Sequence, residues 1–244
     1  WTKQMAKTSS FHKSEMLNYF MSKFGPFINN SLMRNIMGHR VNSFELDAVM
    51  DKRSILLANL SKGKIGEINA HMLGLILISR LQVAVLKRAN RESAERTPFY
   101  LYVDEFQNFA TDTFANLLSE SRKYGLGMHL ANQYLAQLPD SIRDSVFGNV
   151  GTFVAFEVGA EDAKILSQEF APITELDFVG LPRFNFYIKL MIDGKTSEAF
   201  SGMNLHPERV LETSSIKDRV VTLNRLAYGW PRLLVEEEIK RQLA

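Results

Sequence analysis

Hydrophobic positions along the chain fall into blocks, and the spacing within them alternates between that of buried strands and that of helices. Continuous apolar runs of strand length occur at residues 54–60 and 99–103, and shorter runs follow at residues 127–131 and 151–156. Runs of this kind are typical of strands that are covered on both faces, as in a parallel sheet. The pattern therefore predicts four buried strands.

The segments between these runs have helical spacing. A long, mostly apolar helix is expected over residues 67–88, and amphipathic helices are expected over residues 112–124, 139–146 and 161–170. Gly125 follows the second of these helices at the position where a C-terminal cap favours positive φ. Because strand, crossover helix and strand form a right-handed parallel unit, the alternation predicts an α/β fold with a mainly parallel sheet and helices on both faces.

The two ends of the chain depart from this alternation. Asp193-Gly194 lies between two apolar runs and favours a tight turn, so a terminal antiparallel hairpin is expected. Helical spacing predicts a helix over residues 16–24 and another that ends at Gly38. The expected organisation is a helical segment, an α/β core and a tail that contains a helix, at residues 1–50, 51–204 and 205–244.

Composition narrows the class of protein. The 244 residues are 45% hydrophobic and 23% charged, as in an average soluble globular protein, and the net charge of +2 gives no sign of a polycation. The absence of Cys excludes disulfides, thiolate catalysis and thiolate zinc sites. The longest apolar stretch, Met72–Leu86, is interrupted by Arg80 and is short for a membrane span. Because the sequence opens at Trp1 without a signal segment, we expect a piece of a longer protein.

The candidate chemistry starts at the end of the second apolar run, where Asp104 and Glu105 follow residues 99–103. Parallel sheets bind ligands at the carboxyl ends of their strands. In nucleotide-hydrolysing enzymes an Asp at this position holds Mg²⁺, and a following Glu can act on the attacking water. The alternative is that both residues are the polar start of a loop after a core strand.

Two further residues fit a nucleotide site, and each has a simpler explanation. Gln133 follows the third run, where its amide could sense a γ-phosphate, or could satisfy backbone groups in a turn. Arg122 lies in the last turn of the helix over residues 112–124, where a cation also stabilises the helix dipole. The phosphate-binding loop G-x-x-x-x-G-K-[ST] is absent, since Gly63-Lys64 is followed by Ile65.

The order of these segments resembles a known family. LLANLSKGKIGE, PFYLYVDEFQNFAT, SRKYGLGMHLANQYLAQL and the closing hairpin are similar to the latter half of the motor domain of HerA/FtsK-type ATPases. The resemblance is closest to the TraD/TraG-like coupling proteins of conjugation and type IV secretion, and it covers about residues 30–204. It implies a RecA-like P-loop core whose Walker A half lies outside this chain.

The resemblance also implies roles for individual residues. Asp104 corresponds to the Walker B carboxylate for Mg²⁺, Glu105 to the catalytic Glu, and Gln133 to the sensor amide. Arg122 corresponds to an arginine finger that acts on the ATP of a neighbouring subunit. The chain alone is then expected to lack ATPase activity.

The resemblance implies an ATP- and Mg²⁺-dependent hexameric motor that moves DNA, with secretion or relaxosome proteins as further partners. We expect a cytoplasmic location, with any attachment to the inner face of the membrane supplied by segments outside this chain. A DNA channel would be lined by basic residues on either side of the long predicted helix, namely Lys62, Lys64, Lys87, Arg88, Arg91 and Arg96.

Two alternatives belong to other classes of protein. A DNA- or protein-binding scaffold could keep the RecA-like fold without hydrolysing ATP. A soluble α/β enzyme could use Asp104 and Glu105 for other metal chemistry, and it would turn over substrate without any nucleotide. The substrate DNA and the secretion partner are not encoded in these patterns.

Overall fold

The structure is a computed structural model, and it describes residues 12, 14–19, 25, 29–205 and 214–243. The chain divides into two compact units. The first unit comprises Trp1–Glu45, Leu57–Leu73 and Thr213–Ala244, and the second comprises Leu46–Leu56 and Gly74–Glu212. The three-part organisation expected from the sequence stays a prediction.

The second unit contains one parallel and two antiparallel groups of strands. β1 (Phe99–Val103) and β2 (Leu126–Leu130) pair in parallel, with Phe99 opposite Leu126 and Val103 opposite Leu130. In the antiparallel group the order is β3 (Phe153–Ala155), β4 (Asn185–Lys189) and β7 (Phe200–Met203). The sequence therefore located β1, β2 and β3 to within a few residues.

The predicted hairpin is confirmed. β5 (Met191–Ile192) and β6 (Lys195–Thr196) pair antiparallel across Asp193-Gly194. Asp193 has φ 48° and Gly194 has φ 78°. Positive φ at both central residues is the geometry that the Asp-Gly sequence favours in a two-residue turn.

Helices alternate with the strands of the second unit, as the spacing predicted. The α-helices are α4 (Leu46–Asp51), the later part of α6 (Glu67–Lys87), α7 (Asp112–Glu120), α8 (Asp140–Asn149), α9 (Ala160–Glu169) and α10 (Glu175–Val179). Short 3₁₀ turns are η1 (Arg88–Asn90), η2 (Ser93–Glu95), η3 (Phe106–Phe109), η4 (Ser121–Tyr124) and η5 (Leu135–Gln137). Gly125 ends η4 with φ 76°, which confirms the predicted cap.

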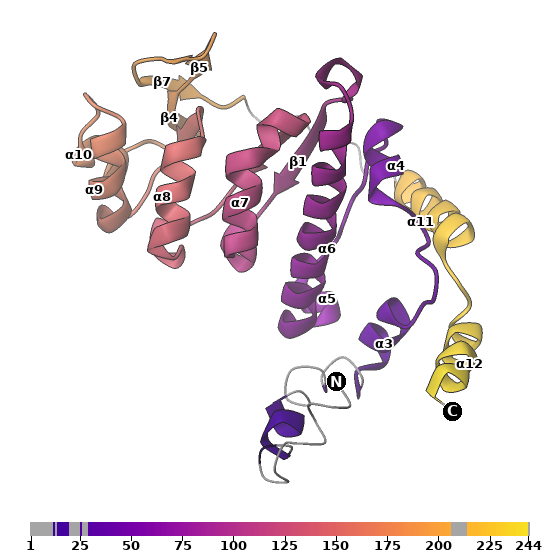
Figure 1. Cartoon of the computed structure of the whole chain (residues 1–244). Coiled ribbons are helices and arrows are strands. Elements are labelled where there is room, and N and C mark those ends of the chain that lie inside the picture. The colour runs from indigo at the N-terminus through magenta and orange to yellow at the C-terminus, as the bar shows by residue number, and fades with distance from the viewer. Residues whose placement is uncertain (1–11, 13, 20–24, 26–28, 206–213, 244) are drawn as a thin grey trace. The chain divides into compact units, whose positions relative to one another are not determined.

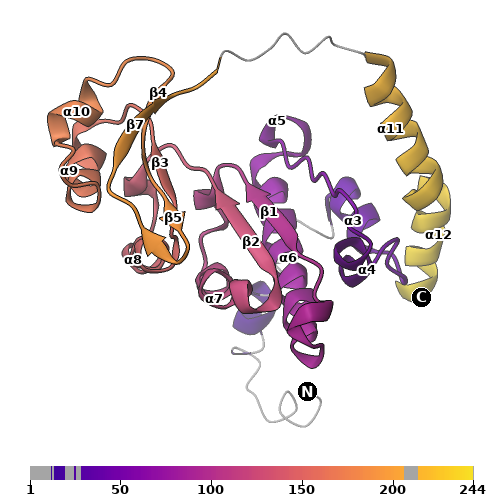
Figure 2. The same ribbon diagram turned by 90° about the horizontal axis from the view of Figure 1, so that it is seen from above.

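One face of the β1–β2 pair carries the hydrophobic core of this unit. Leu101 of β1 and Leu126 of β2 pack in a cluster that includes Val85 of α6 and Phe114 of α7. Figure 1 shows α6, α7 and α8 side by side, and Figure 2 shows them on one side of β1 and β2. The α/β class is confirmed.

The other face of the pair is open within the described part of the chain. It exposes Tyr100, Tyr102 and His129, and the rings of Tyr102 and His129 stack 4.3 Å apart. Within the described residues of the second unit, helices cover one face of β1 and β2, whereas the sequence predicted helices on both faces. The parallel character of the sheet is likewise limited to this pair among the described strands.

The strand predicted at residues 54–60 is not formed. This segment has no regular structure, and Ile55 and Leu57 are 88% and 83% exposed. A strand needs a neighbour that supplies hydrogen-bond partners, and none of the described strands pairs with this segment. The predicted strand–helix–strand unit is therefore incomplete in the described residues.

The described part of the first unit is helical. α3 (Ser31–Met37) begins at an Asn30 cap and ends at Gly38, as predicted, and α5 (Lys62–Ile65) is a single turn. The tail forms α11 (Ser214–Tyr228), which the sequence did not predict, and the expected terminal helix, α12 (Arg232–Leu243). Residues 14–19 are helical, which includes the first part of the helix predicted at 16–24, and residues 20–24 lie outside the described residues.

Among the described residues, one helix is long and apolar enough by length and composition to cross a membrane, at Glu67–Asn90. Several of its apolar residues are buried in the core of the second unit, including Ile78, Leu81 and Val85. This packing fits the core helix that the sequence predicted.

Candidate active site

The parallel pairing of β1 and β2 fixes two loops at one end of the sheet. The backbone N–H of Ala131 donates to Val103 O at 3.0 Å, and the N–H of Phe106 donates to Ala131 O at 3.0 Å. These bonds continue the ladder beyond both strands. Asp104 and Glu105 are therefore held next to the loop that follows β2.

Glu105 has an unusual backbone conformation. Its φ of 52° and ψ of 46° are left-handed, which costs a residue with a Cβ about 1–2 kcal/mol. The turn is stabilised because Glu105 N–H donates to Asp104 Oδ1 and Asn108 Nδ2 donates to Glu105 O, each at 3.0 Å. Phe106 is buried behind the turn and stacks on Phe114. Strain of this kind that the surroundings enforce is common at functional sites.

Two side-chain amides hold the Glu105 carboxylate. Gln133 Nε2 donates to Oε1 at 2.7 Å, and Gln107 Nε2 donates to Oε2. Glu105 is half-buried, whereas Asp104 and Gln133 are exposed. The structure thus brings together the three residues that the sequence had placed at the ends of neighbouring strands. The sequence analysis did not identify Gln107 as a site residue. Its position two residues after Glu105 was the available signal that its amide could reach the carboxylate.

A buried carboxylate supports the loop that carries Gln133. Asp162, in the first turn of α9, is 5% exposed, and its Oδ2 accepts from Leu135 N–H at 2.9 Å. The sequence gave little indication of this role, because an acidic residue in the first turn of a helix is ordinary. Asp162 therefore positions this loop from outside the site.

Arg122 lies away from these residues. It is exposed in η4, which precedes β2, whereas Gln133 follows β2. The ends of a five-residue strand are about 13 Å apart at about 3.3 Å per residue. Arg122 and Glu105 of one chain therefore lie at opposite ends of the β1–β2 pair.

The basic residues predicted to line a DNA channel have different environments. Arg88 is 2% exposed, and its Nη1 donates to Thr97 O at 3.0 Å and Tyr124 O at 3.2 Å. Burial lowers the pKa of the Arg88 guanidinium, and nearby Asp51 opposes this shift. The buried Arg88 side chain does not present its charge to DNA in this structure, so its predicted role as a DNA contact is corrected to a structural one.

The remaining basic residues are more accessible. Lys62 pairs with Glu67 at 2.8 Å, Lys87 pairs with Asp47 at 2.9 Å and Arg91 pairs with Asp51 at 2.7 Å. The hydrogen bond that Arg91 donates to the Asp51 carboxylate raises the pKa of Arg91. Lys64 is exposed, and Arg96 is half-buried and bonded to backbone carbonyls. DNA contact by the accessible residues of this group stays a prediction.

The described residues contain no group of three or more His, Asp or Glu side chains that could hold a metal ion. Mg²⁺ in nucleotide sites needs fewer, because it is held by one or two carboxylates together with phosphates and water. Asp104 is exposed at the end of β1, and one of its oxygens accepts from the Glu105 N–H. Its donor type and position fit such an ion.

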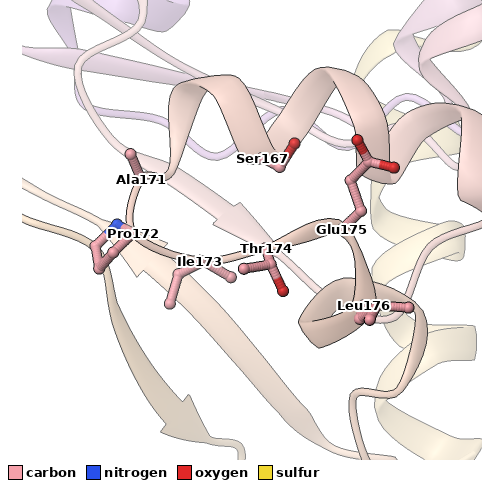
Figure 3. A pocket seen from close by; sticks show the side chains of 7 residues that line it. All are labelled: Ser167, Ala171, Pro172, Ile173, Thr174, Glu175 and Leu176. Atoms are coloured by element: carbon pink, nitrogen blue, oxygen red, sulfur yellow. The ribbon is translucent and has the colours of Figure 1, made fainter.

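A surface hollow lies elsewhere in the second unit (Figure 3). Its lining comes from α9, from the connection to α10 and from the start of α10, with side chains of Ser167, Ala171, Pro172, Ile173, Thr174, Glu175 and Leu176. Glu175 supplies the one ionisable side chain of this lining. We call Asp104, Glu105, Gln107 and Gln133 the carboxylate site. The hollow includes none of these four residues.

Comparisons with known proteins give matches to a family model and to solved structures. No curated protein matches the sequence. The bacterial conjugative coupling protein TrwB, unbound, is 12% identical with a TM-score of 0.49, and TrwB in complex with the GTP analogue GDPNP is 13% identical with a TM-score of 0.49. Both matches cover 58% of this chain and 38% of TrwB, so this chain spans well under half the length of that protein.

A viral protein gives a similar match. The genome packaging NTPase B204 of Sulfolobus turreted icosahedral virus 2, in complex with AMPPCP, is 14% identical with a TM-score of 0.44, over 68% of this chain and 74% of B204. The family model described as the TraM recognition site of TraD and TraG matches residues 98–174, a range that contains Asp104, Glu105, Arg122 and Gln133. Residues 98–174 of this chain are therefore similar to this segment of TraD and TraG.

Proposed function

We propose that this chain is the Walker B half of an ATP-driven, DNA-translocating motor subunit with a RecA-like core, acting as a coupling protein in conjugation or type IV secretion. The observation that carries the proposal is the pairing of Glu105 with Gln133 at the carboxyl ends of two parallel strands. The TraD/TraG-like match over the same residues supports it.

Each residue of the site has a defined task in this proposal. Asp104 holds Mg²⁺, which supplies charge neutralisation on the phosphates when it is bound. Glu105 accepts the proton of the attacking water through a carboxylate oxygen. Gln107 and Gln133 hold that carboxylate in one orientation through their amide bonds. The exposed Gln133 amide can exchange its bond to Glu105 for one to a bound phosphate.

Arg122 acts on a different copy of the chain. Because it lies at the opposite end of the β1–β2 pair from Glu105, it serves the ATP bound to a neighbouring subunit. Its guanidinium then stabilises the charge that develops on the transferred phosphate, a role worth 10³-fold or more in other NTPases. A ring of such interfaces is the homo-hexamer that the resemblance implies.

The proposed partners follow from the same family. DNA is the translocated polymer, and the accessible basic residues Lys62, Lys64, Lys87, Arg91 and Arg96 are its candidate contacts. A TraM-type relaxosome protein is the candidate protein partner, because the matched family model describes a TraM recognition site. The motor would act at the cytoplasmic face of the inner membrane.

The proposal is tested with the complete protein that contains this chain. Glu105→Gln should retain ATP binding, and its rate of ATP hydrolysis should fall by a factor of about 10² or more. The reason is that the amide keeps the shape of the carboxylate without its basicity. Asp104→Asn should weaken Mg²⁺-dependent binding as well. Glu175→Gln is the matched control, because Glu175 is exposed and lies outside the carboxylate site. This variant should keep the wild-type rate of ATP hydrolysis.

Two results would favour the alternatives. If the wild-type protein binds DNA or its protein partner but never hydrolyses ATP, the scaffold is the better description. If it shows metal-dependent turnover of another substrate without nucleotide, Asp104 and Glu105 serve a different enzyme. Wild-type hydrolysis by Glu105→Gln would remove Glu105 from the mechanism.

A further inference from the structure

The turn that carries Arg122 is held by two other arginines. Arg96 Nη1 donates to Lys123 O, and Arg88 Nη1 donates to Tyr124 O at 3.2 Å. These carbonyls belong to the two residues that directly follow Arg122. Both arginines come from the connection between α6 and β1, so a separate segment of the chain fixes this turn.

The two holding arginines are themselves fixed. Arg88 is 2% exposed, also donates to Thr97 O at 3.0 Å, and lies 3.5 Å from Asp51 Oδ1. Arg96 Nε donates to Arg88 O at 3.0 Å, and Arg96 Nη2 donates to Arg91 O at 2.6 Å. The Arg96 guanidinium lies 5.7 Å from the centre of the Tyr124 ring. The network thus leaves Arg88 and Arg96 little freedom to move.

This network changes what Arg122 has to do. Carbonyl groups at a helix end are often bound by a cation from the last turn, which is the simple explanation for Arg122. Here Arg88 and Arg96 bind the carbonyls instead. Within the described residues Arg122 is exposed, and no hydrogen bond or ion pair of its side chain is found. Its charge is therefore available for a ligand or partner outside the chain.

We propose that Arg88 and Arg96 are positioning residues that fix the η4 turn so that Arg122 projects rigidly toward the nucleotide of a neighbouring subunit. The inference rests on the proposed function. It gives Arg88 and Arg96 a role in the ATPase reaction, although neither one touches the nucleotide. Misplacing a catalytic group by about 1 Å can cost about 10²-fold in rate, so a loosened turn should be visible in kinetics.

Arg96 gives the sharper test, because it is half-buried and its removal is less disruptive than removal of Arg88. In the complete protein, Arg96→Ala should lower kcat for ATP by about 10- to 100-fold, with KM for ATP changed less than about threefold. Arg96→Lys should recover part of kcat, because an ammonium group can still donate to the Lys123 carbonyl. Arg183→Ala is the control, since it also removes a guanidinium that lies over an adjacent ring and should keep wild-type kcat.

A double mutant separates positioning from a general loss of structure. If Arg96 acts through Arg122, adding Arg96→Ala to Arg122→Ala should lower kcat by less than about twofold more. Multiplicative losses in the double mutant, or a wild-type kcat in Arg96→Ala while kcat of Arg122→Ala is strongly lowered, would overturn the positioning role and leave the proposed ATPase intact. Wild-type kcat in Arg122→Ala would overturn both the positioning role and the trans role of Arg122.

Discussion

Gly74 in α6 offers a quantitative test of how the core supports the carboxylate site. A Cβ at position 74 would lie 2.7 Å from Cδ1 and 2.8 Å from Cζ of Phe109, and closer still to Cε1. Phe109 ends the η3 turn that begins directly after Glu105. Replacing Gly by Ala inside a helix normally stabilises it by about 1 kcal/mol. Overpacking a filled core site costs about 1–3 kcal/mol, and the overlap here is with a partly buried ring that packs against the core. The gain and the cost together give an expected net destabilisation of up to about 2 kcal/mol for Gly74→Ala.

Gly148→Ala is the matched control. Gly148 lies in α8, and a Cβ there would meet no atom within 4 Å, so the helix preference of Ala should act alone. We expect a gain of about 0.5–1 kcal/mol. Urea unfolding of both variants measures the shift in midpoint at constant m-value. Phe109→Leu in the Gly74→Ala background should recover part of the loss, because it removes the overlapping ring edge. A gain of stability in Gly74→Ala equal to that in Gly148→Ala would refute the packing of Phe109 on α6.

Three further predictions concern other parts of the second unit and the chain as a whole. Asp162→Ala should destabilise the protein by about 1–3 kcal/mol in urea unfolding, because it leaves the Leu135 N–H without its acceptor; an unchanged midpoint would contradict this. The side-chain and backbone bonds from Thr174 lower the pKa of Asp177 below its ordinary value of 3.8, so the stability that Asp177 adds over Asp177→Asn should be present above pH 3.8 and decline as the pH falls through the lowered pKa. A difference between the two proteins that grows on acidification would contradict that assignment. The 244-residue chain alone should bind ATP no more tightly than about 1 μM in calorimetry, because it lacks a phosphate-binding loop, and tighter binding would mean that the nucleotide site is misplaced.

The parts of the site that depend on local pattern were predictable from the sequence. Residues 99–103 form β1 because a short apolar run favours a buried strand. The similar run at residues 127–131 predicted β2, which the structure places at Leu126–Leu130. Parallel strands end at the same edge, so the proximity of Gln133 to Glu105 followed from the order of elements.

The remaining features depend on contacts that a one-dimensional pattern does not contain. The apolar run at residues 54–60 has the composition of a strand, but a strand also requires a paired neighbour, which the described strands do not supply. Arg88 and Arg96 look like surface charges in the sequence, because nothing local shows that they bind the carbonyls of Lys123 and Tyr124. The left-handed backbone of Glu105 is likewise imposed by its surroundings.

The central claim is that Glu105 and Arg122 complete one ATPase site from two copies of the chain. The most direct measurement mixes Arg122→Ala and Glu105→Gln subunits of the complete protein, each inactive alone, and records ATP hydrolysis in oligomers verified to contain both. Some interfaces then pair an intact Glu105 with an intact Arg122, so the account predicts partial recovery of activity. Arg225→Ala, which removes an exposed arginine from the last turn of α11, should hydrolyse ATP normally without mixing. No recovery in the mixed oligomers, or full activity of Arg122→Ala alone, would contradict the account.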